Sequence, residues 1–233
     1  MDEYRARLRT LETAHWQEFL TAHSGLPGPR GNIELGKAVA EEADARTVDA
    51  LLATDDEYLV FCGVVGLGRL LADSGAGADA DRLGARLREH ATDTRWRVRE
   101  AVAMALQRLG DSDVARMVDV VTDWAGDDHA LVQRAAVAGI CEPRLLRTPE
   151  MARTAVDACE RVTASLAARP ADERRLPAVR TLRQALGYCW SVAVAADPSP
   201  GLPRFLALST SPDPDVAWIV HDNRGKARLA TLL

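Results

Sequence analysis

The sequence has few aromatic residues. They make up 5% of the 233 residues, whereas hydrophobic residues as a class make up 47%. Ala, Leu, Arg and Val dominate instead, a mixture that favours helix over sheet. No segment shows the strict polar–apolar alternation that indicates a strand. The composition therefore predicts an all-α protein, and the chain is long enough to bury a continuous core.

Long apolar runs are missing as well. The longest run, 187–196, is shorter than the roughly 20 residues that a membrane-spanning helix needs. The N-terminal stretch MDEYRARLRTLETAHWQEFL is charged and lacks the apolar centre of a signal peptide. We therefore expect no membrane segment and a cytoplasmic location.

Cysteine and histidine are scarce and scattered. The five histidines show no metal-ligand spacing, and the sequence has no GxSxG motif and no phosphate-binding loop. The four cysteines form no CxxC pair and lie in apolar helical stretches: Cys62, Cys141, Cys159 and Cys189. They are expected to be reduced core residues. The glycines of GVVGLG (63–68) lie inside a helical pattern and predict close helix packing. We expect no metal and no cofactor.

An excess of positive charge is also absent, since the formal net charge is -5. A protein that binds nucleic acid by bulk attraction is usually basic, so any contact with DNA would depend on a local patch. Arginine is dense in two segments, 95–108 and 174–183. These segments could follow phosphates, although such density is equally common on solvated helices. The loop GLPGPRGN (25–32) predicts a stiff joint, with Arg30 as a candidate contact.

Helical periods fill nearly the whole chain and are interrupted by short Gly, Pro and Asp segments. Five helices are expected to start after an aspartate, a favoured N-cap because its carboxylate accepts the unpaired N–H groups of the first turn. These aspartates, spaced 35 to 44 residues apart, are Asp55, Asp93, Asp128, Asp172 and Asp213. The expected helices are 2–22, 32–43, 45–53, 56–73, 79–91, 94–109, 112–125, 128–142, 149–167, 173–195, 202–209 and 214–230.

A helix pair that recurs about every 40 residues is typical of HEAT and armadillo repeats. The stretches DTRWRVREAVAMALQRLGD (93–111) and LVQRAAVAG (131–139) resemble HEAT repeats most closely, and the resemblance covers about 32–233. It implies a single domain, a right-handed α-α superhelix of about five helix pairs, with residues 1–31 as an N-terminal helical arm and Gly/Pro loop. Proteins of this superfamily mostly bind other macromolecules on their concave side.

One face of the helix expected over 94–109 carries an apolar stripe: Val98, Val102, Ala105 and Leu109. Each residue advances by about 100°, so Trp96 and Glu100 point away from this stripe and lie one turn apart. The same construction in later repeats completes a candidate concave binding face of Trp96, Glu100, Arg134, Arg180, Gln184 and Tyr188. The alternatives are packing of Trp96 between repeats and a structural salt bridge between Glu100 and Arg134.

A second resemblance concerns Trp96-x3-Glu100, the Trp124–Arg134 pair ten residues apart, and Gly187-Tyr188. This order is similar to that of the HEAT-like alkylpurine DNA glycosylases over about 94–200, although those enzymes have Asp for Glu100 and Trp for Tyr188. The resemblance implies that Glu100 stabilises positive charge on the deoxyribose as a methylated base leaves. It also implies that Arg134 binds a phosphate and that Trp96 and Tyr188 contact the base.

The sequence therefore predicts a non-enzymatic HEAT-repeat module that holds a macromolecular partner, expected to be a protein, on its concave face. The alternative is an N-glycosylase, or a non-catalytic relative, that acts on alkylated purines in duplex DNA through a local basic patch. Glu100 would be its catalytic residue.

Overall fold

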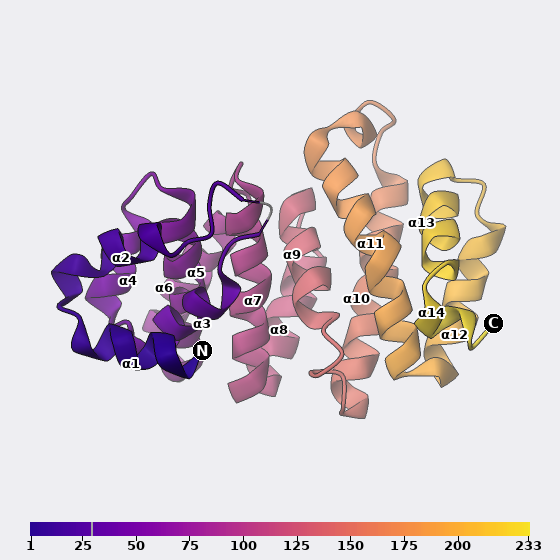
Figure 1. Ribbon diagram of the computed structural model, residues 1–233. Coiled ribbons are helices and arrows are strands. Elements are labelled where there is room, and N and C mark those ends of the chain that lie inside the picture. The colour runs from indigo at the N-terminus through magenta and orange to yellow at the C-terminus, as the bar shows by residue number, and fades with distance from the viewer. Residues whose placement is uncertain (29) are drawn as a thin grey trace. The chain divides into compact units, whose positions relative to one another are not determined.

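The computed structural model describes residues 1–28 and 30–233, and every regular element in these ranges is a helix (Figure 1). The predicted all-α class is therefore confirmed. The described chain divides into two compact units, Met1–Ser112 and Asp113–Leu233. None of the described helices has both the length and the apolar character that crossing a bilayer requires.

The first unit is built around one buried helix, α5 (Glu57–Asp73). Helices α3, α4, α6 and α7 all pack against α5. Residues 1–31, expected to form an arm, belong to this unit, because α1 packs against α3 and α2 against α5. The remaining helices of the unit are α1 (Asp2–Thr10), α2 (Trp16–Ala22), α3 (Ile33–Glu42), α4 (Ala45–Leu52), α6 (Ala78–His90) and α7 (Trp96–Ser112).

Glycines allow α5 to approach its neighbours closely, as GVVGLG predicted. A Cβ on Gly68 would lie 2.5 Å from the Cα and Cβ of Ala105 on α7. A Cβ on Gly66 would lie 2.8 Å from the Val48 side chain on α4. The expected apolar stripe of α7 is buried completely, with Val98, Val102, Ala105 and Leu109 all at 0% exposure.

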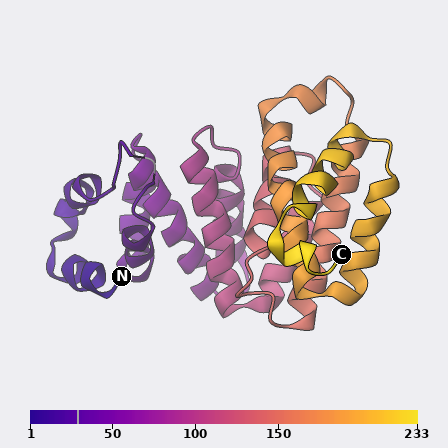
Figure 2. The same ribbon diagram turned by 45° about the vertical axis from the view of Figure 1, so that its right-hand side comes forward.

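The second unit is centred on α11 (Pro177–Ala196), which packs against α9, α10, α12 and α13 (Figure 2). Each of these helices follows a short connection, as expected for a chain of helix pairs. Their bounds, with those of the other helices of the unit, are α8 (Val114–Ala125), α9 (Ala130–Ile140), α10 (Pro149–Ala168), α12 (Pro198–Ala207), α13 (Pro214–Arg224) and α14 (Ala227–Ala230).

Three of the expected helices are interrupted. The helix predicted over 2–22 stops at Thr10, because Leu11 and Glu12 have extended backbones, and continues as a 3-10 turn and α2. The helix predicted over 173–195 begins as a separate 3-10 turn, and Pro177 then starts α11 after the extended Leu176. The helix predicted over 214–230 ends at Arg224, and α14 follows as a separate element.

The aspartate caps are only partly confirmed. Asp213 caps α13 by accepting the backbone N–H groups of Asp215 and Val216. At α5 the cap is Asp56 rather than Asp55, and at α9 it is His129 rather than Asp128. Asp172 precedes the 3-10 turn and makes no side-chain cap bond.

The four cysteines are all free and buried, which confirms that they are core residues. Within the described ranges, no group of three or more His, Cys, Asp or Glu side chains is arranged to hold a metal ion.

Candidate functional site

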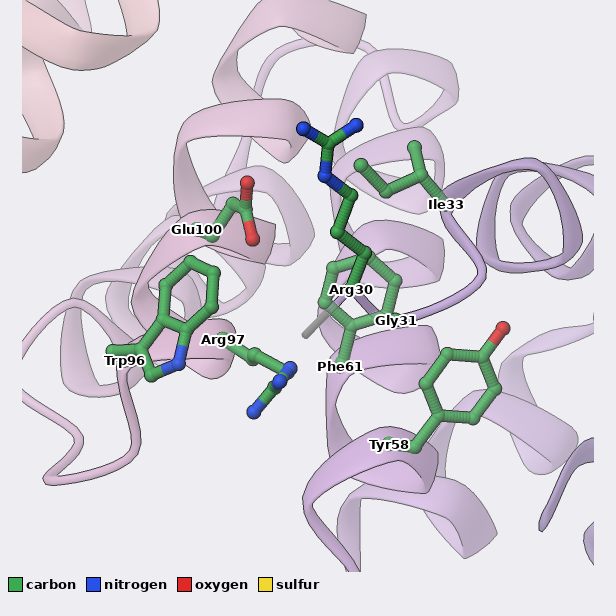
Figure 3. Close-up of a pocket in the computed structure, with 8 residues that line it drawn as sticks. All are labelled: Arg30, Gly31, Ile33, Tyr58, Phe61, Trp96, Arg97 and Glu100. Atoms are coloured by element: carbon green, nitrogen blue, oxygen red, sulfur yellow. The ribbon is translucent and has the colours of Figure 1, made fainter. Parts of the chain in front are cut away.

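A pocket of about 330 Å³ opens on the first unit where the loop before α3 meets the N-terminal halves of α5 and α7 (Figure 3). It combines three aromatic rings with two guanidinium groups and one carboxylate. Its lining residues are Arg30, Gly31, Ile33, Tyr58, Phe61, Trp96, Arg97 and Glu100.

Asn32 fixes the wall that comes from the loop. Its side-chain oxygen caps α3 by accepting the Leu35 N–H at 3.0 Å. Its backbone N–H donates to the Ser24 carbonyl at 2.8 Å, and its own carbonyl accepts the Tyr58 hydroxyl at 2.7 Å. These bonds tie the loop to α5, so Arg30 and Ile33 are held beside the pocket.

Tyr58 and Phe61 form the inner part of the pocket and are almost completely buried. Their rings stack with centroids 5.7 Å apart. Burial raises the pKa of Tyr58 far above its ordinary value, so the phenol remains a neutral donor to the Asn32 carbonyl. The base of the pocket is therefore apolar and carries no charge.

Trp96 stands at the mouth of the pocket and is 49% exposed, unusually open for an indole. The Arg97 guanidinium lies over its ring, 5.0 Å from the centroid. Arg97 is itself held by Glu57 at 3.1 Å and by the Gly28 carbonyl at 3.0 Å. The indole is therefore positioned by a fixed cation on one face while much of its surface remains accessible.

Glu100 lies one turn after Trp96 on α7 and is half-buried. Figure 3 shows its carboxylate between the indole ring and the Arg30 side chain, which lies in front of Phe61. The predicted proximity of Trp96 and Glu100 on a face opposite the α7 core is thus confirmed. Both residues line the same pocket.

The other predicted site residues lie in the second unit. Arg180, Gln184 and Tyr188 are exposed along one face of α11, at the four-residue spacing of the prediction. The Arg228 guanidinium lies 4.9 Å from the centroid of the Tyr188 ring and also donates to the Tyr188 hydroxyl at 3.0 Å. Arg134 is half-buried in α9, close enough to the buried Cys189 to act on the pKa of that thiol.

Most arginines of the proposed phosphate-binding segments have carboxylate partners in their own unit. Arg95 pairs with Asp93 at 2.7 Å, and Arg183 pairs with Asp215 at 2.7 Å. The remaining pairs are Arg97–Glu57, Arg108–Glu41 and Arg174–Asp213. This pairing reduces the positive charge that these segments offer to a polyanion.

Sequence reasoning missed three lining residues: Ile33, Tyr58 and Phe61. The available signal was that Tyr58 and Phe61 lie three residues apart at the start of a predicted helix. This spacing indicates only core packing, because the loop that lies beside them in the structure is distant in the sequence. Arg30 was considered only as a candidate contact on a stiff loop.

No family model matches the sequence, and no curated protein matches it either. Among solved structures, the chain is similar to two crystal structures of engineered proteins. One is 17% identical, with a TM-score of 0.39 over 99% of this chain and 96% of that chain. The other is 16% identical, with a TM-score of 0.34 over 88% of this chain and 96% of that chain. At these values neither similarity bears on function, and membership of the HEAT-repeat family stays a prediction.

Proposed function

We propose that this protein is a binding protein and that the pocket around Trp96 takes up a segment of a partner protein. The observation that supports the proposal is the exposure of the Trp96 indole. A large aromatic side chain held open over an apolar pocket is the usual centre of a protein interface, where Trp is enriched among the residues that contribute most to affinity. Arg97 donates hydrogen bonds to Glu57 and to the Gly28 carbonyl, and these bonds hold Arg97 and the indole beside it in place before a partner binds.

A protein partner fits the charge better than DNA does. Residues 1–112 contain 14 Lys and Arg against 19 Asp and Glu, so the first unit carries the whole net charge of -5. DNA would be repelled by this charge, because nucleic-acid affinity depends mainly on neutralising phosphates with free cations. The ion pairs of Arg95, Arg97 and Arg108 with carboxylates also disfavour DNA, because these cations are already neutralised within the unit.

Affinity capture from the source proteome tests the proposal, with Trp96→Ala compared to the unaltered protein. We expect Trp96→Ala to lose the specific partner, since removal of a central interface Trp costs about 2 kcal/mol or more, about 30-fold in affinity. Leu206→Ala is the matched control, because Leu206 is a 40% exposed apolar residue of the second unit. Equal capture by Trp96→Ala and the unaltered protein, both folded by circular dichroism, would contradict the proposal.

The second candidate is an alkylpurine N-glycosylase, and one observation favours it: Trp96 and Glu100 share a pocket. A carboxylate beside an aromatic ring can stabilise a cationic base and the positive charge that develops as it leaves. The test is release of methylated purines from alkylated duplex DNA by the unaltered protein, Glu100→Gln and Arg134→Ala. Release that both substitutions abolish would support the enzyme. Absence of release from the unaltered protein, together with no salt-dependent DNA binding, would rule it out.

A further inference from the structure

A second pocket of the first unit lies next to the pocket around Trp96, which we call the indole pocket. The second pocket has a volume of about 410 Å³ and lies between residues 21–28 and the start of α5; we call it the loop pocket. Tyr58 and Arg97 line both pockets and form the wall between them. Hydrogen bonds hold the Arg97 side chain in place, so the two pockets form one binding surface.

The indole pocket is suited to a large apolar side chain. Phe61 and Tyr58 close its inner end, while Ile33, 38% exposed, and Trp96 flank the opening. Its volume of about 330 Å³ accommodates one such side chain but not a continuous strand. The rest of a bound segment must therefore lie outside the indole pocket, where the loop pocket is the adjoining surface.

The two pockets differ in charge. In the indole pocket Arg30 and Glu100 carry opposite charges, and Figure 3 shows the Glu100 carboxylate between the indole and the Arg30 side chain. The loop pocket has two carboxylates, Asp56 and Glu57, and one guanidinium, Arg97. Because Arg97 pairs with Glu57 at 3.1 Å, the charge of Asp56 is left over in the loop pocket.

Asp56 is available to a cation. It is exposed and forms no ion pair with any residue in the described ranges. Its carboxylate accepts the N–H groups of Tyr58 and Leu59, which fix it at the start of α5. A helix N-terminus carries about half an elementary positive charge, less than the full negative charge of this carboxylate. A cationic side chain is therefore attracted to the loop pocket, and the net charge of -5 of residues 1–112 adds to this attraction.

We infer that the partner segment places a large apolar side chain in the indole pocket and a neighbouring Lys or Arg side chain against Asp56 in the loop pocket. Since the pockets share a wall, residues close together in the partner sequence can fill both. The aliphatic stem of a Lys or Arg side chain can also lie along Leu26 and Pro27, which line the loop pocket. The inference rests on the proposed function and specifies the chemistry of the partner segment.

Three peptides test the inference: N-acetyl-Gly-X-Phe-X-Gly-amide, with X as Lys, Gln or Glu. The same residue on both sides of Phe lets either chain direction place X at Asp56. Binding is followed through the indole N–H resonance of Trp96, assigned by its loss in Trp96→Phe. We expect the Lys peptide to bind about two- to fivefold tighter than the Gln peptide, the effect of one exposed ion pair. The Glu peptide should bind most weakly.

Two substitutions separate the charge of Asp56 from the charge of the whole unit. Asp56→Asn removes the charge but keeps a good N-cap, so the Lys and Gln peptides should bind this folded variant equally. Asp81→Asn removes the same charge from an exposed position of α6 that lines neither pocket, and the preference for Lys should remain. A rise in NaCl from about 20 mM to about 500 mM should weaken the preference in the unaltered protein.

Several results would overturn the inference: the Lys and Gln peptides bind the unaltered protein equally, no peptide shifts the Trp96 resonance, the preference survives Asp56→Asn, or Asp81→Asn abolishes it as well. Tighter binding of the Glu peptide, or a shift caused only by a short DNA duplex, would also overturn it and identify an anionic ligand. If Trp96→Ala still loses its captured partner under any of these results, the proposed function stands and only the basic segment is wrong. If capture is unaffected as well, both proposals fail.

Discussion

At the scale of single residues, the pocket depends on how Arg97 is used. Its guanidinium joins Glu57 at the start of α5, the Gly28 carbonyl in the loop and the indole of Trp96 on its own helix. One side chain thus links three segments of the first unit. Trp96 lies on the face of α7 opposite the buried stripe, and the contact with Arg97 holds the exposed indole in one position.

Gly68 is the clearest residue-level requirement of the fold. Because a Cβ there would lie 2.5 Å from the Cα and Cβ of Ala105, Gly68→Ala must push α5 and α7 apart. We expect it to lower the free energy of unfolding by about 1–3 kcal/mol, as measured by urea denaturation. Gly84→Ala on α6 is the control, since nothing lies within 4 Å of its Cβ position. It should raise stability by about 0.5–1 kcal/mol. Equal effects of the two substitutions would contradict the described packing.

Glu42 makes stability depend on pH. Hydrogen bonds from Arg9 and Arg5, together with their positive charges, lower the pKa of Glu42 below its usual value, although burial acts in the opposite direction. A carboxyl whose pKa is lowered by folding stabilises the fold above its unfolded pKa and loses this contribution as pH falls through the folded pKa. We expect Glu42→Gln to cost about 1 kcal/mol at pH 7.

The cost of Glu42→Gln should begin to shrink as pH falls below about 4.3, the ordinary pKa of a Glu in the unfolded chain, and should vanish as pH falls through the lower pKa of the folded carboxyl. Urea denaturation of both proteins at pH 7 and at the lowest pH that keeps them folded measures this difference. Glu89→Gln, at an exposed position on α6, should change stability by less than about 0.5 kcal/mol at either pH. A cost that is the same at both pH values would show that Glu42 contributes through packing and not through its charge.

At the scale of helices, the structure and the sequence-based expectation differ in which residue caps the N-terminus of α5. Asp56 accepts the N–H groups of Tyr58 at 2.8 Å and Leu59 at 2.9 Å, whereas Asp55 was the predicted cap. We expect Asp56→Ala to lower the free energy of unfolding by about 1 kcal/mol. Asp55→Ala should stay within about 0.5 kcal/mol, as measured by the same denaturation. A larger loss of stability from Asp55→Ala than from Asp56→Ala would show that Asp55 is the cap, as the sequence suggested.

Helix positions were largely predictable from the sequence, because apolar periodicity fixes which segments are helical and which face is buried. The stripe of Val98, Val102, Ala105 and Leu109 shows this directly. Helix ends were less predictable, since neighbouring Asp residues compete for the same cap and differ only in backbone angles. The break at Leu11 has no Gly or Pro to signal it.

The site was predictable only where it lies on one helix. Trp96 and Glu100 are four residues apart, so helical geometry alone places them together. Arg97 and Gly28 are 69 residues apart, and their contact depends on the path of the loop before α3. Periodicity carries no information about such a path. The sequence alone therefore could not predict that Tyr58 and Phe61 line the pocket.

At the scale of the whole molecule, charge is unevenly distributed. The first unit carries a net charge of -5, and the second has 15 Lys and Arg against 15 Asp and Glu, so it is neutral. Net charge governs long-range attraction and solubility rather than the fold. A partner that docks on the first unit is therefore favoured if its overall charge is positive.

The buried thiols also give the protein its own reporters of local opening. Cys62 lies in the first unit, and Cys141, Cys159 and Cys189 lie in the second. Burial raises the pKa of Cys62, and an alkylating reagent reaches such a thiol only when the surrounding helices separate.

Alkylation at pH 8, mapped by mass spectrometry, should be slow at all four sites in the native state. The three thiols of the second unit should then react at one common rate as urea is raised. If any of them reacts as fast as a thiol in a short peptide, the helices around it open independently of the rest of the unit. One chain, without any added label, thus yields a separate opening rate for each of its two units.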